Sequence, residues 1–313
     1  MIQTENLGKT FDHFVAVQHL NLQVGAGVLL ALLGPNGAGK TTTVRMLSSI
    51  LRPTSGRAQV NGYDVVAQPA QVRQSIGMLT EQPGLYLRMT GLEYLLFYGR
   101  LYGLSDKAIR ARGLELFRRF NMEDASNRRL GQYSKGMRQK VGLIRAMLHN
   151  PAVLLLDEPT SAMDPYSAKL VRDAIREMRD ERRSIILCTH NLAEAESLSD
   201  RIAIIKQGEL VAEGTAVSLK QQLLGQPRLE VRVDQRLNGQ ISGLEALVTI
   251  EAIGEQTIRY RTPDPERTNP LLVRRLGELG LGVIALQEVS QSLEAVYLRV
   301  VGAEEAENGA ANA

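Results

Sequence analysis

The segment from Gly34 to Thr41 carries the residue types that bind phosphate. Its sequence, Gly-Pro-Asn-Gly-Ala-Gly-Lys-Thr, fits the phosphate-loop pattern G-x-x-x-x-G-K-[ST]. Glycines let the backbone N–H groups point inward, and the helix expected behind them adds partial positive charge. Lys40 is expected to reach the β- and γ-phosphates of a nucleoside triphosphate, and the Thr41 hydroxyl to bind Mg²⁺. The predicted nucleotide-binding residues are Gly34, Pro35, Asn36, Gly37, Ala38, Gly39, Lys40, Thr41 and Thr42.

Two adjacent acids, Asp157 and Glu158, end an apolar run that starts at Val153. A buried strand that ends in two carboxylates is costly unless the carboxylates have cationic partners. Mg²⁺ beside the phosphate loop is such a partner. We therefore predict that Asp157 holds the metal through its water shell, and that Glu158 polarises the water that attacks the γ-phosphate.

His190 and Phe11 are further candidates because of their positions. His190 follows the apolar strand predicted at 184–189, at the end of a parallel strand where doubly wound sheets place ligands. Phe11 stands in a polar stretch, Gly-Lys-Thr-Phe-Asp-His. It is either a partly buried loop aromatic or a stacking face for a purine, and composition does not separate the two interpretations.

An α/β core has to position these side chains. Residues 28–33 form a short apolar run typical of a buried parallel strand, and apolar residues recur at helical spacing over 42–50. Residues 201–212 predict a closing hairpin with its turn at Gln207-Gly208. Residues 86–147 are predicted to be largely helical, as an insert between two halves of the core.

The composition is that of an ordinary soluble protein with a full core. The 313 residues are 44% hydrophobic and 23% charged, with a net charge of +3. The one cysteine, Cys188, lies in an apolar run and is expected to be a small buried hydrophobe. No apolar run approaches the roughly 20 residues that span a bilayer, and the N-terminus lacks a signal-peptide pattern. We therefore expect an intracellular protein.

The organisation changes around residues 222–227, Gln-Leu-Leu-Gly-Gln-Pro. Residues 229–233 and 257–261 alternate strictly, as strands do, and helical stretches are expected near 270–279 and 292–300. The predicted divisions are an α/β domain at 1–222 with a helical subdomain near 84–147, a small α+β domain at 227–302, and a disordered tail at 303–313.

The order of these motifs resembles the nucleotide-binding subunit of an ATP-binding cassette (ABC) transporter, over residues 2–217. Residues 34–41 are like its Walker A loop, and residues 154–158 are like Walker B with the adjacent catalytic glutamate. Residues 133–139, Tyr-Ser-Lys-Gly-Met-Arg-Gln, resemble its signature, usually written Leu-Ser-Gly-Gly-Gln. Three shorter matches are the D-loop at Ser161 to Asp164, the switch histidine at His190 and the adenine-stacking aromatic at Phe11.

The resemblance implies a P-loop NTPase cassette with a RecA-like core, an antiparallel β subdomain and a helical insert. It also implies a head-to-tail dimer, with a second copy or with another ABC subunit, that encloses two ATP molecules. Ser134 and Gly136 would complete the γ-phosphate cradle of the other subunit at a helix N-terminus. Lys135 and Met137 stand where glycine and glutamine are common, but the two phosphate-binding positions are retained.

The family's glutamine loop, which contacts Mg²⁺ and the partner, falls at residues 81–82. Spacing from Gly77 indicates Glu81, whereas side-chain chemistry favours Gln82, to which we assign the contact. The resemblance thus gives Lys40, Glu158 and His190 as catalytic residues and Thr41, Asp157 and Gln82 as metal contacts.

The sequences of two segments, 81–86 and 292–297, most resemble those of the family branch whose separate permeases export drugs, polysaccharides, lipids or sodium. The implied partner is a transmembrane permease, and the implied location is the cytoplasmic face of the plasma membrane.

One alternative is a soluble ABC ATPase that acts on DNA or ribosomes. The single cassette, the lack of a coiled-coil period and the small net charge argue against it, so no nucleic-acid partner is expected. Another is a regulatory module that barely hydrolyses ATP, against which Glu158 argues.

Overall fold

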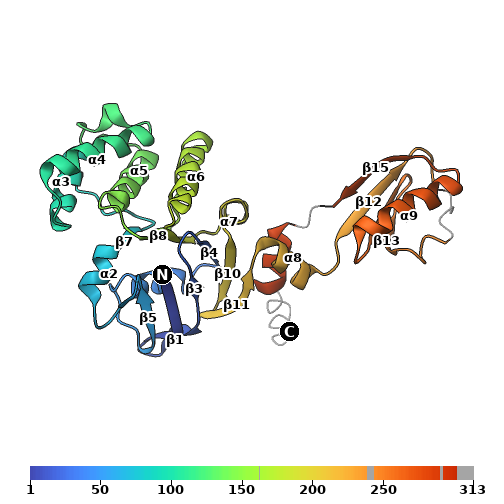
Figure 1. The fold of residues 1–313 in the computed structure, drawn as a ribbon, viewed down its shortest axis with the longest axis horizontal. Coiled ribbons are helices and arrows are strands. Elements are labelled where there is room, and N and C mark those ends of the chain that lie inside the picture. The colour runs from blue at the N-terminus through green and yellow to red at the C-terminus, as the bar shows by residue number, and fades with distance from the viewer. Residues whose placement is uncertain (162, 238–242, 290–291, 302–313) are drawn as a thin grey trace, which may run out of the picture. The chain divides into compact units, whose positions relative to one another are not determined.

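The buried strands predicted on both sides of the phosphate loop meet in one six-stranded sheet of the computed structural model (Figure 1). The contacts divide the chain after Ala216 into two units, which we describe separately. The residues that the structure describes are 1–161, 163–237, 243–289 and 292–301.

The six strands lie in the order β11-β10-β4-β9-β8-β7. All neighbours are parallel except β11, which pairs with β10 as the predicted hairpin. Strands β4, β8 and β9 are buried along their whole length, as expected for parallel strands covered on both faces. The bounds are β4 Leu29–Leu33, β7 Ile76–Leu79, β8 Val153–Asp157, β9 Ser184–Cys188, β10 Arg201–Lys206 and β11 Glu209–Gly214.

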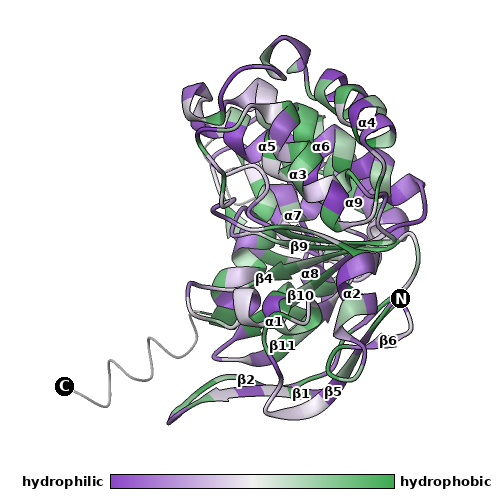
Figure 2. Cartoon of the chain, turned by 90° about the vertical axis from the view of Figure 1, so that its left-hand side faces the viewer, coloured by the Kyte–Doolittle hydropathy of each residue, from purple (hydrophilic) through white to green (hydrophobic). Residues whose placement is uncertain are grey.

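The two faces of this sheet belong to two hydrophobic clusters. Alternate residues of β8 show the division, because Leu154 packs with the helical insert and α6, whereas Leu155 packs with α1 and the antiparallel strands. Figure 2 shows the strands in green between these two layers. Cys188 lies in the second cluster and is fully buried, as predicted. The helices are α1 Lys40–Leu47, α2 Pro69–Ser75, α6 Pro165–Asp180 and α7 Leu192–Leu198.

The N-terminal region forms an antiparallel sheet around β1, which agrees with the antiparallel β subdomain that the family resemblance implies. Apolar and polar residues alternate over 20–24, a pattern that predicts a single strand, and the structure differs from it in one respect. His19 has a positive φ of 48°, and the chain leaves β2 at Leu20 and rejoins β1 as the short strand β3. Burial still alternates from Leu20 to Val24, which is why the pattern suggested one strand. The bounds are β1 Ile2–Phe11, β2 Phe14–Leu20, β3 Gln23–Val24, β5 Ser55–Val60 and β6 Tyr63–Asp64.

The helical insert between β7 and β8 is confirmed, and its helices start at capping residues. Thr90 forms a capping box with Glu93, and Ser105 and Ser134 each accept a backbone N–H of the helix that follows. Apolar side chains of the insert form one core with the sheet. The helices are α3 Gly91–Leu101, α4 Asp106–Arg119 and α5 Lys135–Met147, with 3₁₀ turns η1 Glu123–Ala125 and η2 Leu130–Gln132.

The second unit is an antiparallel sheet in the order β13-β14-β12-β15, with a core of its own. The predicted strands at 229–233 and 257–261 and both predicted helical stretches are present. Arg259 pairs with Glu230 at 2.7 Å, across neighbouring strands. The elements are α8 Ala216–Leu224, β12 Arg228–Val233, β13 Thr249–Ile253, β14 Thr257–Arg261, α9 Pro265–Glu278 and β15 Val283–Glu288, followed by helical residues 293–301.

Within the described residues, no helix combines the length and the apolar character that crossing a membrane requires. The tail predicted at 303–313 lies outside the described residues.

Candidate nucleotide-binding and hydrolysis site

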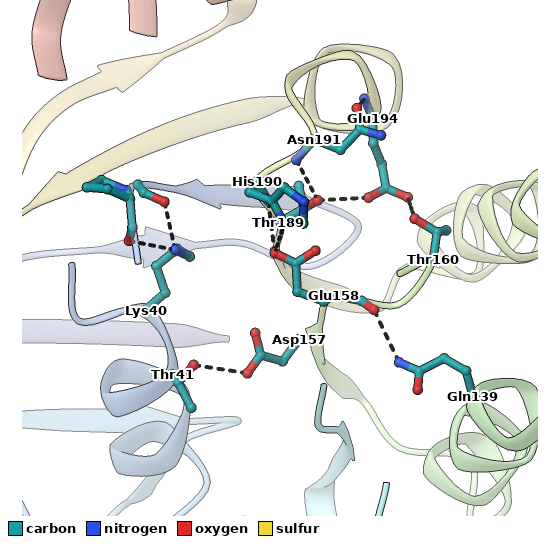
Figure 3. A network of polar contacts seen from close by, with 12 residues as sticks. Lys40, Thr41, Gln139, Asp157, Glu158, Thr160, Thr189, His190, Asn191 and Glu194 are labelled. Carbon is teal, nitrogen blue, oxygen red and sulfur yellow. Dashed lines mark hydrogen bonds and ion pairs between the residues drawn. The ribbon is translucent and has the colours of Figure 1, made fainter. Parts of the chain in front are cut away.

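The phosphate loop connects β4 to α1, as its sequence predicts. Gly39 is the residue before α1 and has φ 104°, which a glycine adopts without strain. The ammonium group of Lys40 points back into the loop and donates to the carbonyl oxygens of Gly34 at 2.7 Å and Pro35 at 3.0 Å (Figure 3). A positive charge therefore lies inside the ring of the loop, where phosphate oxygens are expected.

The first carboxylate of the acid pair lies directly beside this loop. The Thr41 hydroxyl donates to Oδ2 of Asp157 at 3.1 Å, across 116 residues of sequence. Asp157 is only 4% exposed, and burial raises its pKa while the Thr41 hydrogen bond lowers it. One hydroxyl and one carboxylate beside a phosphate site fit Mg²⁺, which keeps several waters and takes few protein ligands. No cluster of three or more His, Cys, Asp or Glu side chains suited to a metal occurs in the described part of the chain.

Glu158 and His190 are in direct contact at the ends of β8 and β9. Oε1 of Glu158 accepts the His190 backbone N–H at 2.9 Å and lies 2.7 Å from the ring Nδ1 (Figure 3). The backbone N–H of Glu158 donates to Cys188 O at 2.9 Å, and its φ is 51°, a left-handed value that turns the chain after β8. The Glu158 side chain is 14% exposed, whereas that of His190 is 73% exposed.

The loop of residues 80–84 follows β7, with both candidate residues, Glu81 and Gln82, exposed. The Glu81 charge is near enough to contribute to the raised pKa of Asp157, behind burial and the charge of Glu158. Glu81 therefore lies close enough to Asp157 for the two charges to interact, although side-chain chemistry favours Gln82 as the metal contact.

Arg145 of α5 holds both ends of this loop. Its guanidinium donates to Met78 O at 3.2 Å, before the loop, and to the Tyr94 hydroxyl at 2.9 Å. That hydroxyl in turn donates to Gly84 O at 3.3 Å, after the loop. The helix that starts at Ser134 is thus tied to the loop of residues 80–84.

Ser134 and Gly136 lie at the start of α5, and no hydrogen bond among the described residues joins them to the phosphate loop. Ser134 is the N-cap residue and accepts the Met137 N–H at 3.2 Å. Asp164 caps α6 in the same way, accepting the Ser167 N–H at 2.9 Å. The predicted signature residues therefore occupy an exposed helix N-terminus, as an action on another subunit would require.

Phe11 and Ser161 are the two remaining candidates, and each lies outside the regular core of the sheet. Phe11 ends β1 with 43% of its surface exposed, and the ammonium group of Lys9 lies 5.0 Å from the ring centre. An exposed ring is available for stacking, in contrast to a core aromatic. Ser161 follows the acid pair in a turn, and its N–H donates to Glu158 O at 3.2 Å.

Sequence reasoning missed two residues, Gln139 and Glu194, whose side chains hold the segments around the acid pair. Gln139 of α5 donates to Glu158 O at 3.1 Å. Glu194 of α7 accepts hydrogen bonds from the hydroxyls of Thr160 and Thr189. The pattern Asn191-x-x-Glu194 signals a helix start, but nothing local in the sequence indicates that its carboxylate reaches Thr160.

Strand order, phosphate loop and acid pair define an ATPase of the P-loop α/β class. The family model described as "ABC transporter" matches residues 17–161. The daunorubicin/doxorubicin resistance ATP-binding protein DrrA of Streptomyces peucetius is 37% identical over 305 residues, covering 96% of this chain and 92% of the relative. The ABC transporter ATP-binding protein NatA of Bacillus subtilis is 44% identical over 205 residues, covering 65% of this chain and 83% of the relative.

Solved structures agree with these relatives. A structure described as the ATP-binding subunit of an ABC transporter has a TM-score of 0.68 and 30% identity, covering 72% of this chain and 94% of that chain. A dimeric cassette bound to ADP and phosphate shares the fold, with a TM-score of 0.65 and 24% identity over 69% of this chain and 98% of that chain. The chain therefore belongs to the ATP-binding proteins of ABC transporters, and it is an ATPase subunit of that family.

Proposed function

We propose that this subunit hydrolyses Mg-ATP at two composite sites and thereby drives export through a separate membrane permease. The observation that carries the proposal is the convergence of Lys40, the Thr41–Asp157 contact and the Glu158–His190 contact at one edge of the parallel sheet. In this proposal residues 1–222 form the ATP-binding domain, with the helical subdomain near 84–147, and residues 227–302 form an accessory domain.

Each side chain has a role that its contacts support. Lys40 exchanges its two loop carbonyls for the β- and γ-phosphates, which offer it full negative charges. Glu158 accepts a proton from the attacking water, and His190 orients the Glu158 carboxylate through its ring nitrogen. Phe11 stacks on the adenine.

Thr41, Asp157 and the loop of Glu81 and Gln82 are the groups that would hold Mg²⁺. The metal supplies charge stabilisation for the phosphate oxygens. The donor set supports magnesium because it offers hard oxygen ligands and few of them. The charge of Glu81 contributes to the raised pKa of Asp157, which supports Glu81 as a candidate metal contact beside Gln82.

A second ABC subunit would complete each site, either a second copy or a different chain. Ser134 and Gly136 stand at an exposed helix N-terminus, which favours phosphate oxygens. Ser161 and Asp164 would contact the same partner, which their partial or full exposure allows. The dimeric arrangement of a cassette with the same fold supports this proposal.

An exposed apolar surface on the helical insert supports docking to a permease. It comprises Tyr86, Leu87, Phe97 and Leu101, each at least 38% exposed, and we call it the α3 surface. The rings of Tyr86 and Phe97 pack edge to face at 5.6 Å. Docking there would place this subunit peripherally on the cytoplasmic face of the membrane. Relatives named for daunorubicin and linearmycin resistance support export as the direction of transport.

The test is Glu158→Gln in the full-length chain. The amide oxygen can still accept the two His190 contacts, so we expect unchanged folding and ATP binding. Loss of the base should reduce kcat by about 10²- to 10⁴-fold and give a dimer that stays closed with ATP. Glu209→Gln, at an exposed hairpin position, is the control. Wild-type turnover of Glu158→Gln would refute the site, and capture of this chain from native membranes without a hydrophobic partner would refute the permease.

A further inference from the structure

The carboxylate of Glu194 is buried behind the Glu158–His190 contact and takes no direct part in the proposed chemistry. The residue is 2% exposed. Its Oε1 accepts the Thr160 hydroxyl at 2.7 Å, and its Oε2 accepts the Thr189 hydroxyl at 2.9 Å (Figure 3). In the part of the chain that the structure describes, no lysine or arginine forms an ion pair with it.

A carboxylate that is buried without an ion pair costs desolvation free energy at a core position. Burial raises the pKa of Glu194, and the hydrogen bonds from the Thr160 and Thr189 hydroxyls lower it, as does the charge of Arg172. A leucine or methionine would fill the same space without desolvating a charge. The two hydroxyl contacts, rather than packing, are what this side chain adds.

The helix cap does not account for the carboxylate either. Asn191 and Glu194 occupy the N-cap and N3 positions of α7, and Asn191 Oδ1 accepts the Glu194 N–H at 3.0 Å. In a capping box the glutamate would accept the N-cap N–H directly. Here the Asn191 N–H donates to the Thr189 hydroxyl at 3.1 Å, and that hydroxyl donates onward to the glutamate.

The two threonines belong to the two segments that carry the reacting pair. Thr160 lies two residues after Glu158, in the turn after β8, and Thr189 lies immediately before His190, at the end of β9. These two segments are in contact through Glu158 and His190. Glu194 joins them a second time, through its hydrogen bonds with Thr160 and Thr189. Each segment is therefore held at two points.

We propose that Glu194 is a positioning residue for ATP hydrolysis, because its carboxylate ties the Glu158 segment to the His190 segment and fixes the separation of these two side chains. The proposal rests on the roles assigned above to Glu158 and His190. Misplacement of reacting groups by about 1 Å costs on the order of 10²-fold in rate. Loss of either hydroxyl contact should therefore act on kcat and leave ATP affinity in place.

Thr160→Val tests the inference because valine keeps the side-chain shape and removes only the hydroxyl. We expect kcat of the full-length chain to fall about 10- to 100-fold with KM for ATP changed less than about twofold. In the Glu158→Gln background the ATP-bound dimer should still form. Thr160→Ser, which restores the hydroxyl, should restore kcat.

Thr4→Val is the control, since Thr4 is a buried threonine of β1 whose hydroxyl donates to the backbone oxygen of Leu20 at 2.9 Å. It should lower the melting temperature and leave kcat unchanged. Thr160→Val should also lose its effect in a His190→Ala background, because a residue that acts through the pair has nothing left to position. Equal effects in both backgrounds, or wild-type kcat in Thr160→Val, would overturn the inference.

If Thr160→Val fails to fold, Glu194→Gln applies the same test, since it keeps the volume and one accepting oxygen. A reduced kcat with unchanged KM supports the inference, and a wild-type kcat overturns it. The two proposals fail differently. If Glu158→Gln is active, the proposed catalytic site is refuted. If Glu158→Gln is inactive and Thr160→Val is fully active, only the proposed role of Glu194 is refuted.

Discussion

Alanine at Gly39 should destabilise the phosphate loop far more than alanine at Gly37, although both glycines have positive φ. A Cβ at Gly39 would lie 2.5 Å from the backbone oxygen of Ala16 and 3.0 Å from Cγ2 of Val17, with φ 104°. A Cβ at Gly37, with φ 81°, would meet nothing within 4 Å. Only the conformational cost applies at Gly37, whereas steric overlap with a backbone atom adds to it at Gly39.

The left-handed conformation costs a non-glycine residue about 1–2 kcal/mol. Overpacking adds about 1–3 kcal/mol, so Gly39→Ala should cost about 2–5 kcal/mol against about 1–2 kcal/mol for Gly37→Ala. In a domain of this size each kcal/mol lowers the melting temperature by roughly 2–4 °C. We therefore expect Gly39→Ala to melt several degrees below Gly37→Ala.

Thermal unfolding without nucleotide, followed by circular dichroism, measures both variants under the same conditions. ATP titration of the two proteins then separates a damaged loop from a damaged fold. If Gly37→Ala melts at or below the temperature of Gly39→Ala, the argument from the Ala16 oxygen is wrong.

Two further predictions concern the helical insert. Burial lowers the pKa of His149, which stacks on Tyr102, to about 4. The unfolded chain takes up this proton below its ordinary pKa of 6.5, so stability is present above that pH and falls, by up to about 3 kcal/mol, as the pH drops towards 4. His149→Gln should remove this part of the pH dependence in urea unfolding. Arg145→Met removes the donor to Met78 O and to the Tyr94 hydroxyl, and should cost about 1–3 kcal/mol in the same assay at pH 7.

Exposed residues of the same types serve as controls for this pair. His13→Gln should leave the pH dependence as in the wild type, and Arg110→Met should unfold at the wild-type urea concentration. A His149→Gln protein that still loses the same stability between pH 7 and pH 4.5 would contradict the assignment. An Arg145→Met protein as stable as the wild type would show that the loop ends are held by other contacts.

The elements that the sequence predicted well are those defined by neighbours in the chain. A buried apolar run at residues 28–33, glycines and then helical spacing specify strand, loop and helix locally, because each depends on contacts within a few residues. Gln207-Gly208 likewise specified its hairpin turn, with φ 50° and 85°. Strands β13 and β15 escaped prediction because they are half exposed and lack a clear alternation of apolar and polar residues.

The sequence by itself supplied the chemical groups of the site, namely a lysine in a glycine loop, two acids after a buried strand and a histidine after another. Only the tertiary structure decided which of them meet. The strand order places β4, β9 and β8 side by side, so Thr41 reaches Asp157 and Glu158 reaches His190 across 116 and 32 residues. The role of Glu194 could be inferred only from the tertiary structure. Its carboxylate accepts hydrogen bonds from the hydroxyls of Thr160 and Thr189, and these residues come from segments that are far apart in the sequence.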